Sequence, residues 1–316
     1  MLVSVIVITY NSSRFVAQTL ESILRQTYKN IELIVSDDCS TDDTFLFCTR
    51  WVAKHQGRFS RTVCTQTPHN GGICWNYNHA LKLAKGVWTK YIAGDDILSD
   101  NCIERFICNI RDDCHLYYSG QQQCLDTKDA ITFPYYTLPK IPNADATSQL
   151  KLILRYTYGI HGTALFANKS ILTRLDGFDE GYPYIEDRPI TYKFLTNGKP
   201  IGLIPEVLVM WRVYSDSVSH ESSIVNKHFT KDMDNVEYHY RTRYCLRYGL
   251  LLQWYHCVSE HYINNNYDKG GTRRFLGYLL RSIDVLFWYR RKHPIQTVNV
   301  QPGIFQQFQR LPEHNQ

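Results

Sequence analysis

The 316-residue chain lacks several features that would assign it at once to a common class of protein. It has ten cysteines but no Cys-x-x-Cys pair, so no zinc-ribbon or thioredoxin-type motif is present. It contains no apolar run of about 18 residues, the length that a membrane-spanning helix needs. The N-terminus lacks the basic start and small-residue cleavage site of a signal peptide. We therefore expect reduced thiols, no membrane span and a cytoplasmic location.

A strong excess of charge of one sign is also missing. The net charge is only +5, so we expect no nucleic-acid partner, although the sign suits anionic small molecules and anionic membrane surfaces. Hydrophobic residues make up 44% of the chain and aromatic residues 14%, enough to build a sizeable core. This composition excludes a disordered protein.

The first strand-to-helix turn lacks the Gly-x-Gly-x-x-Gly motif of dinucleotide-binding proteins. A β-branched run over 2–8, a helical pattern around 20–24 and a second apolar run over 31–35 predict a βαβ unit. Its turn reads Thr9-Tyr10-Asn11-Ser12-Ser13 instead, which argues against a dehydrogenase. These polar side chains can hydrogen-bond a base or a ribose; alternatively, Ser12 or Ser13 caps the following helix.

Further alternation of strand and helix patterns predicts an α/β fold with a Rossmann-like mixed sheet flanked by helices. The expected strands cover about 62–64, 88–92, 115–119, 161–167 and 201–209, and the expected helices cover 75–84, 101–111 and 146–156. After residue 215 the chain changes to long, aromatic and basic helical segments. We expect a catalytic domain over 1–215, with a donor nucleotide-binding half (1–100) and an acceptor half (101–215), followed by a helical C-terminal extension (216–316).

Two acidic pairs, Asp37-Asp38 and Asp95-Asp96, each follow a predicted strand directly. Because ligands bind outside the carboxyl ends of strands in open α/β sheets, the two loops are expected to meet at one crevice. Clustered carboxylates there suit a hard cation, Mn²⁺ or Mg²⁺, that bridges diphosphate oxygens. Each pair taken alone is equally consistent with capping of the next helix.

A third acidic pair, Glu186-Asp187, precedes a helical pattern over 190–195. Transfer of a sugar with inversion needs a carboxylate that removes the proton of the attacking hydroxyl. Asp187 is our candidate for this base, and Glu186 is the second choice. The alternative is that one of them pairs with Arg188 or caps the helix.

Four segments in this order resemble the GT-A fold glycosyltransferases of family 2: residues 5–11, 22–28, 31–42 and 94–98. The resemblance is strong over 1–100 and moderate over 159–215. It implies an inverting, single-displacement transfer from a nucleotide-sugar donor, most often a UDP-sugar, to a saccharide acceptor. The site residues that follow from it are the donor-binding Thr9, Tyr10, Asn11, Asp38, Asn70 and Asp95, the metal ligands Asp95 and Asp96, and the base Asp187.

Three positions depart from the family pattern. Ala93 replaces the first Asp of the metal motif, Tyr77 stands where an Arg often precedes Asn78, and the segment 211–214 does not end in His. His220 is a candidate replacement for that His. These departures leave open a catalytically inactive nucleotide-sugar-binding or scaffold protein. A nucleotidyltransferase is disfavoured because no Gly-rich basic loop follows the first strand.

Two further segments concern the acceptor. His161 lies where the family's acceptor-facing segment is expected, although a structural histidine is the favoured explanation. The segment 270–292 has a helical apolar face with arginines beside it, which suits a membrane interface or packing on the catalytic domain. A membrane-bound enzyme at the inner face of the cell membrane would suit a polyprenyl-diphosphate-linked acceptor in surface polysaccharide synthesis.

Overall fold

The computed structural model describes residues 1–126, 131–132, 136–137, 143–156, 162–215, 217, 224–266 and 271–284. Its strands are β1 (Val3–Thr9), β2 (Ile31–Asp37), β3 (Arg61–Gln66), β4 (Trp88–Ala93), β5 (Ile97–Leu98), β6 (Leu116–Asp126), β7 (Ile131–Thr132), β8 (Tyr136–Thr137), β9 (Leu165–Asn168) and β10 (Ile201–Val213). Its α-helices are α1 (Val16–Leu24), α2 (Thr44–His55), α3 (Ile73–Leu83), α4 (Cys102–Cys108), α5 (Ala146–Tyr156), α6 (Lys169–Arg174), α7 (Asp187–Thr196), α8 (Ile224–Arg247), α9 (Leu251–Asn266) and α10 (Gly271–Ser282). Two short 3₁₀ turns, η1 (Gln56–Arg58) and η2 (Gly162–Ala164), complete the list.

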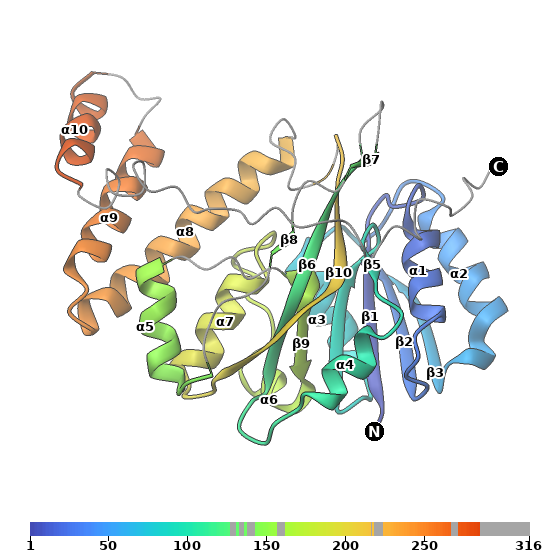
Figure 1. The fold of residues 1–316 in the computed structure, drawn as a ribbon. Helices are drawn as coiled ribbons and strands as arrows, with labels where there is room; N and C mark the ends of the chain where they lie inside the picture. Colours follow the sequence, from blue (N-terminus) through green and yellow to red (C-terminus); the bar gives the residue numbers. More distant parts are fainter. Residues whose placement is uncertain are drawn as a thin grey trace.

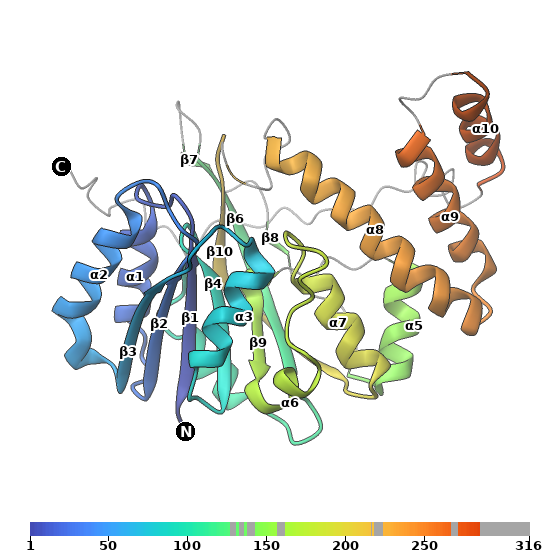
Figure 2. The same ribbon diagram turned by 180° about the vertical axis from the view of Figure 1, so that it is seen from behind.

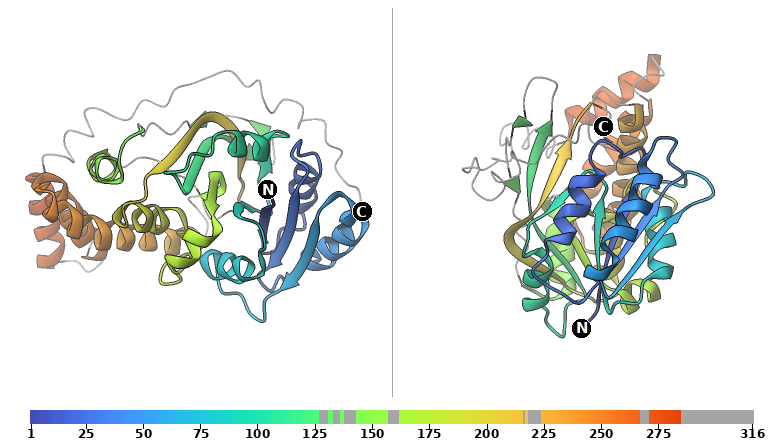
Figure 3. Two further views of the ribbon diagram at one scale, coloured as in Figure 1. Left: turned by 90° about the horizontal axis from the view of Figure 1, so that it is seen from below. Right: turned by 90° about the vertical axis from the view of Figure 1, so that its right-hand side faces the viewer.

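The strands form one mixed sheet in the order β3-β2-β1-β4-β9-β6-β10-β5, with β7 and β8 pairing on β6. The N-terminal part of the sheet is parallel, since β1 pairs in parallel with both β2 and β4 and β2 pairs in parallel with β3. β9 runs antiparallel to both of its neighbours, β4 and β6. The sheet is strongly curled (Figure 3). The predicted fold class, a mixed sheet flanked by helices, is confirmed.

Alternating side chains of the central strand β1 face two separate cores. Val3, Val5 and Val7 pack in one apolar cluster with residues of α1, α2 and α4, whereas Ile6 and Ile8 pack in the other with residues of α3, α5 and α7. The β-branched run therefore reads as continuous because both of its faces are buried. Figures 1 and 2 show these two helical layers on opposite faces of the sheet.

The register of the parallel strands brings the predicted loops together. Thr9 at the end of β1 lies beside Asp37 at the end of β2, and Ile8 lies beside Ala93 at the end of β4. The segments that follow these three strands therefore leave the sheet at the same edge. This edge forms one wall of the cleft described below.

Two strand boundaries in the segment 101–215 differ from the sequence-based expectation. The strand expected over 115–119 continues to Asp126, because β6 pairs with the whole length of β10. The strand expected from 161 begins only at Leu165, since Gly162–Ala164 forms the 3₁₀ turn η2. Local apolar patterns could not show either boundary.

The C-terminal helices extend away from the sheet (Figure 1). α8 contacts α5 and α7, and its Cys245 belongs to the core cluster on that face of the sheet. α9 packs on α8, and α10 packs on α9. Among the described helices, none is both long and apolar enough to cross a bilayer.

Candidate active site

A cleft of about 860 Å³ lies at the carboxyl ends of β1 and β4. Nearly all of the side chains predicted to form the site line it: Thr9, Tyr10, Asn11, Asp38, Asn70, Asp95, Asp96, Glu186 and Asp187. His161 and His220 lie outside the described residues. The cleft thus brings together three acidic loops that are far apart in the sequence.

The turn after β1 is held by hydrogen bonds to the loop after β2. Asn11 has a left-handed backbone (φ 48°), and its side-chain oxygen accepts a hydrogen bond of 2.9 Å from the Thr41 amide. Thr9 donates from its hydroxyl to Asp37 at 2.8 Å. Tyr10 remains 48% exposed at the rim of the cleft. The alternative role of this turn, side-chain capping of α1, is not observed, because Phe15 occupies the N-cap.

The two carboxylates of the first acidic pair do different things. Asp37 is fully buried behind the cleft and accepts hydrogen bonds from Thr9, Ser40 and Gln66. Asp38 lines the cleft, although it is only 4% exposed. It accepts the Gly71 and Gly72 amides at 3.0 and 2.8 Å and the Thr67 hydroxyl at 3.1 Å. Asp38 therefore fixes the backbone of the loop that carries Asn70.

The turn after β4 is packed closely against the turn after β1. A Cβ atom on Gly94 would lie 2.7 Å from the Thr9 methyl carbon, so only glycine fits. Asp96 is buried and accepts the Arg212 amide at 2.9 Å. Burial raises the pKa of both Asp95 and Asp96, and the neighbouring Asp95 charge raises that of Asp96 further. Arg212 acts in the opposite direction on both carboxyls.

Arg212, on β10, anchors this part of the cleft. Its guanidinium donates to the Asp95 carbonyl at 3.0 Å, to Asp126 at 3.0 Å and to Gln18 at 2.6 Å. It also lies 4.5 Å from the centre of the Phe15 ring. From the sequence, the segment 211–214 stands out only because it does not end in the His that is common in the family. The role of Arg212 could not be predicted, because its partners come from distant parts of the chain.

The acidic loop fits a divalent cation that takes most of its ligands from a bound diphosphate. Asp95 and Asp96 both line the cleft, and the Arg212 guanidinium offsets only part of the cost of burying their charges. Mg²⁺-type sites typically use one or two carboxylates together with substrate phosphates and water. Within the described part of the chain, three potential ligand atoms come within 4.8 Å of one another only at His256, Glu260 and Asp284, none of which lines the cleft.

Glu186 and Asp187 stand at the start of α7 and face the cleft. Neither of the structural alternatives is observed: Glu186 occupies the N-cap without a side-chain hydrogen bond, and Arg188 forms its ion pair with Glu237. Burial raises the pKa of Glu186 to about 8 and that of Asp187 to about 6. Because two adjacent buried carboxyls resist double ionisation, the pair keeps a proton near neutral pH. The Arg188 guanidinium lowers the pKa of Asp187, which makes Asp187 the ionised member.

Several residues of the cleft were not predicted. The most informative is Gly162, where an added Cβ would lie 1.6 Å from a Glu186 carboxylate oxygen. Thr163, Gln121 and Phe229 also line the cleft. Phe229 comes from α8, so the C-terminal helices contribute to the wall. Nothing in the local sequence patterns around these residues marks them, since each reaches the cleft through tertiary packing.

The curled mixed sheet, with acidic loops at the carboxyl ends of its parallel strands, defines a GT-A type glycosyltransferase. Residues 4–171 match the model of the family described as "Glycosyl transferase family 2". The chain belongs to this family.

Similar proteins include a UDP-Glc:alpha-D-GlcNAc-diphosphoundecaprenol beta-1,3-glucosyltransferase, WfaP from Escherichia coli. It is 30% identical over 220 residues, covering 69% of this chain and 80% of WfaP. The putative glycosyltransferase EpsE of Bacillus subtilis is 27% identical over 264 residues, covering 82% and 87% of the two chains.

Two solved structures show the same fold. TarS from S. aureus in complex with UDP-GlcNAc has a TM-score of 0.59 at 18% identity, covering 94% of this chain and 93% of the other. The mannosyltransferase PcManGT from Pyrobaculum calidifontis, in complex with GDP-Man and Mn²⁺, has a TM-score of 0.56 at 14% identity, covering 92% and 82%.

Proposed function

We propose that the chain transfers a sugar from a nucleotide-diphosphate donor, a UDP-sugar, to a hydroxyl of a saccharide acceptor with inversion at the anomeric carbon. The observation that carries the proposal is the convergence of Asp38, Asp95 and Asp187 on one cleft. The UDP and UDP-GlcNAc complexes of TarS support the choice of nucleotide. Residues 1–215 would form the catalytic domain and 216–316 its helical extension.

The proposed donor site occupies the part of the cleft beside β1 and β4. Thr9, Tyr10 and Asn11 would contact the base and ribose, with the exposed Tyr10 ring available for stacking. Asn70 would hydrogen-bond the donor from the loop that Asp38 holds in place. The diphosphate would then lie toward Asp95, with its reactive bond directed at Asp187.

In the proposed reaction, the Asp187 carboxylate accepts the proton of the acceptor hydroxyl as its oxygen attacks the anomeric carbon. The bond from that carbon to the diphosphate oxygen breaks, and its electron pair leaves with the nucleoside diphosphate. A neutral Glu186 beside Asp187 reduces repulsion of the leaving diphosphate. Because the attack is direct, no covalent sugar–enzyme intermediate forms.

Asp95, with Asp96 behind it, would hold Mn²⁺ or Mg²⁺ in this proposal. The cation would supply Lewis-acid stabilisation of the diphosphate as it departs. The Mn²⁺ in the PcManGT complex and the position of both carboxyls on the cleft support this assignment.

Binding of UDP and Mn²⁺ tests the donor site independently of the acceptor. UDP should raise the melting temperature of the full chain, and Mn²⁺ should increase that shift, because a ligand that binds only the native state stabilises it. Asp95→Asn should abolish the Mn²⁺ increment and retain a smaller UDP shift. The absence of any shift with UDP, GDP or other nucleoside diphosphates in the presence of Mn²⁺ would refute the proposal and favour an inactive scaffold.

We further propose that the acceptor is linked to a polyprenyl diphosphate and that α10 brings the enzyme to the membrane surface. The printed activity of WfaP on a diphosphoundecaprenol-linked sugar supports the acceptor class. Support for the membrane contact comes from the exposure of large apolar side chains: Phe275 (67%) and Leu279 (51%) on α10, and Ile283 (61%) directly after it. Their spacing puts them on one helical face.

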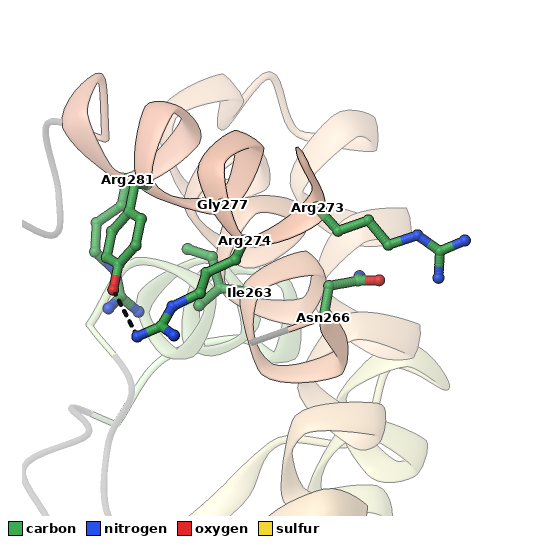
Figure 4. A pocket seen from close by; sticks show the side chains of 7 residues that line it. Ile263, Asn266, Arg273, Arg274, Gly277 and Arg281 are labelled. Carbon is green, nitrogen blue, oxygen red and sulfur yellow. Dashed lines mark hydrogen bonds between the residues drawn. The ribbon is translucent and has the colours of Figure 1, made fainter. Parts of the chain in front are cut away.

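The opposite face of α10 carries the contact with α9. Figure 4 shows Gly277 above Ile263 of α9, and a Cβ on Gly277 would lie 3.3 Å from that side chain. Arg273 and Arg274 flank this contact in the same view. A solvent-facing row of large apolar side chains suits insertion into a bilayer interface, while Arg273 and Arg274 lie on the side of the helix that faces α9. The alternative expected from sequence is that this apolar face packs on the catalytic domain. The exposure of the face over residues 271–284 supports the membrane contact instead.

Co-sedimentation with liposomes tests the membrane contact. Full-length protein should sediment with vesicles containing phosphatidylglycerol and less with neutral vesicles, and a Phe275→Ser/Leu279→Ser/Ile283→Ser variant should stay in the supernatant. Equal sedimentation of the variant and the parent would refute a role for α10. Sugar transfer by the variant to a water-soluble acceptor, measured without liposomes, serves as the control that it is folded.

A further inference from the structure

The ion pair between Arg188 and Glu237 links the segment of the proposed base to the C-terminal helix α8. Arg188 Nη1 lies 2.7 Å from Glu237 Oε1, and the two side chains are only 15% and 16% exposed. Arg188 is the residue directly after Asp187, whereas Glu237 comes from the middle of a helix 49 residues further along the chain. Both lie beyond residues 4–171, the part that matches the family model.

Glu237 is itself held on its second oxygen. Arg241 donates to Glu237 Oε2 at 3.1 Å from the next turn of α8. Arg241 is buried and also donates to the carbonyl of Leu154 on α5. Glu237 therefore sits between two guanidinium groups, and α5 and α8 together fix its position. A carboxylate that is fixed by these contacts can hold the Arg188 side chain in one orientation.

The orientation of Arg188 matters because its charge has two candidate partners. Among the described residues, the ion pair of Arg188 is with Glu237, and no ion pair within 4.0 Å joins it to Asp187. A buried guanidinium without Glu237 would turn to the nearest remaining carboxylate, since an unpaired buried charge is costly. Asp187 is the other carboxylate whose charge acts on Arg188, and its oxygens must stay available to an acceptor hydroxyl.

We propose that Glu237 is a positioning residue that engages Arg188 and thereby keeps the Asp187 carboxylate free to act as the base. The Arg188 charge then stabilises the ionised form of Asp187 without forming an ion pair with it. The inference rests on the proposed function, because it takes Asp187 as the base. It also gives the C-terminal extension a role in the chemistry.

The groups around Asp187 set the direction of the pH effect. They are Glu186 and Arg188 on its own segment, Cys74 from α3, Tyr118 from β6 and Glu237 from α8. Burial raises the pKa of Cys74 and Tyr118 well above their ordinary values, so both are neutral near pH 7. The Glu237 charge raises the pKa of Asp187, and its removal should lower that pKa.

The test is the pH profile of sugar transfer by Glu237→Gln in the full-length protein. We expect kcat to fall about 10- to 100-fold, with the donor KM within about twofold, because the base is misplaced while the donor site is intact. The acidic limb of the kcat profile should move to lower pH. Glu237→Asp should recover part of kcat, since it keeps the charge but shortens the reach.

The matched control is Glu206→Gln, which removes the carboxylate of a more exposed ion pair with Arg105. It should behave as the parent in kcat and in the pH profile. If Glu237→Gln is unfolded at the assay temperature, Glu237→Asp carries the test, with a smaller displacement of the limb in the same direction. An unmoved acidic limb in an active, folded variant would overturn the inference. A parent protein without transferase activity would instead overturn the proposed function.

Discussion

Substitution of Asp38 tests how the loop 67–72, which carries Asn70, is held in place. Asp38 is only 4% exposed, and its two oxygens accept three hydrogen bonds, from Gly71, Gly72 and Thr67. In Asp38→Asn, one oxygen becomes an amide nitrogen, which cannot accept from the backbone amide that it faces. The variant loses one or two charge-assisted hydrogen bonds and leaves a buried N–H without an acceptor.

The expected cost follows from these contacts. A hydrogen bond to a charged group contributes about 1.5–3 kcal/mol, and an unsatisfied buried group costs about 1–3 kcal/mol. Since part of this is recovered by relaxation of the loop, we expect the free energy of unfolding to fall by about 2–4 kcal/mol. The loop also carries Asn70, so UDP affinity should fall about tenfold.

Urea denaturation followed by circular dichroism measures the first effect, and calorimetric titration with UDP measures the second. The control is Asp43→Asn, on the loop after β2 that also carries Asp38; the Asp43 side chain makes no capping hydrogen bond and is exposed. It should change the urea midpoint by less than a quarter of the Asp38→Asn effect, as is usual at surface positions. An Asp38→Asn variant that matches the parent in midpoint and in UDP affinity would refute the reasoning.

Three further predictions concern the base. Transfer by the parent should fall tenfold per unit below about pH 6, where Asp187 gains its proton, and a flat rate between pH 5 and 7 would contradict this. Glu186→Gln should stabilise the unliganded protein by about 1–2 kcal/mol at pH 8.5. Because the pKa of Glu186 is raised to about 8 in the folded protein, ionisation of this side chain destabilises the parent as the pH rises from about 4 through 8. The melting temperatures of parent and variant should therefore converge below about pH 4. Equal melting temperatures at pH 8.5 would refute the prediction. Gly162→Ala should displace the Glu186 carboxylate and lower kcat about tenfold with UDP binding retained; an unchanged kcat in a steady-state assay would show that this contact is dispensable.

The fold of residues 1–100 was predictable because its sequence signals are local. The β-branched run of β1 is buried on both faces, and the parallel register of β1, β2 and β4 follows from the βαβ pattern. Acidic residues placed directly after such strands must reach the same edge of the sheet. The positions of Asp38 and Asp95 on the cleft therefore agree with what order and spacing alone predicted.

The remaining part of the site depends on contacts that no local pattern encodes. Arg212 reaches Asp95 and Gln18 from β10, across more than a hundred residues of sequence. Glu237 meets Arg188 only because α8 returns to pack on α7. The requirement for glycine at position 162 is visible only when the Glu186 side chain is in place. Such features need the tertiary structure.

Sugar transfer by the parent protein and by Asp187→Asn is the most direct test of the proposed reaction. The assay supplies a panel of UDP-sugars, Mn²⁺ and a polyprenyl-diphosphate-linked saccharide, follows UDP release, and assigns the anomeric configuration of the product by NMR. We predict an inverted product from the parent and a rate at least about 10³-fold lower for Asp187→Asn, with UDP affinity within about twofold. Turnover by Asp187→Asn at a rate close to the parent's, or a product with retained configuration, would contradict the account.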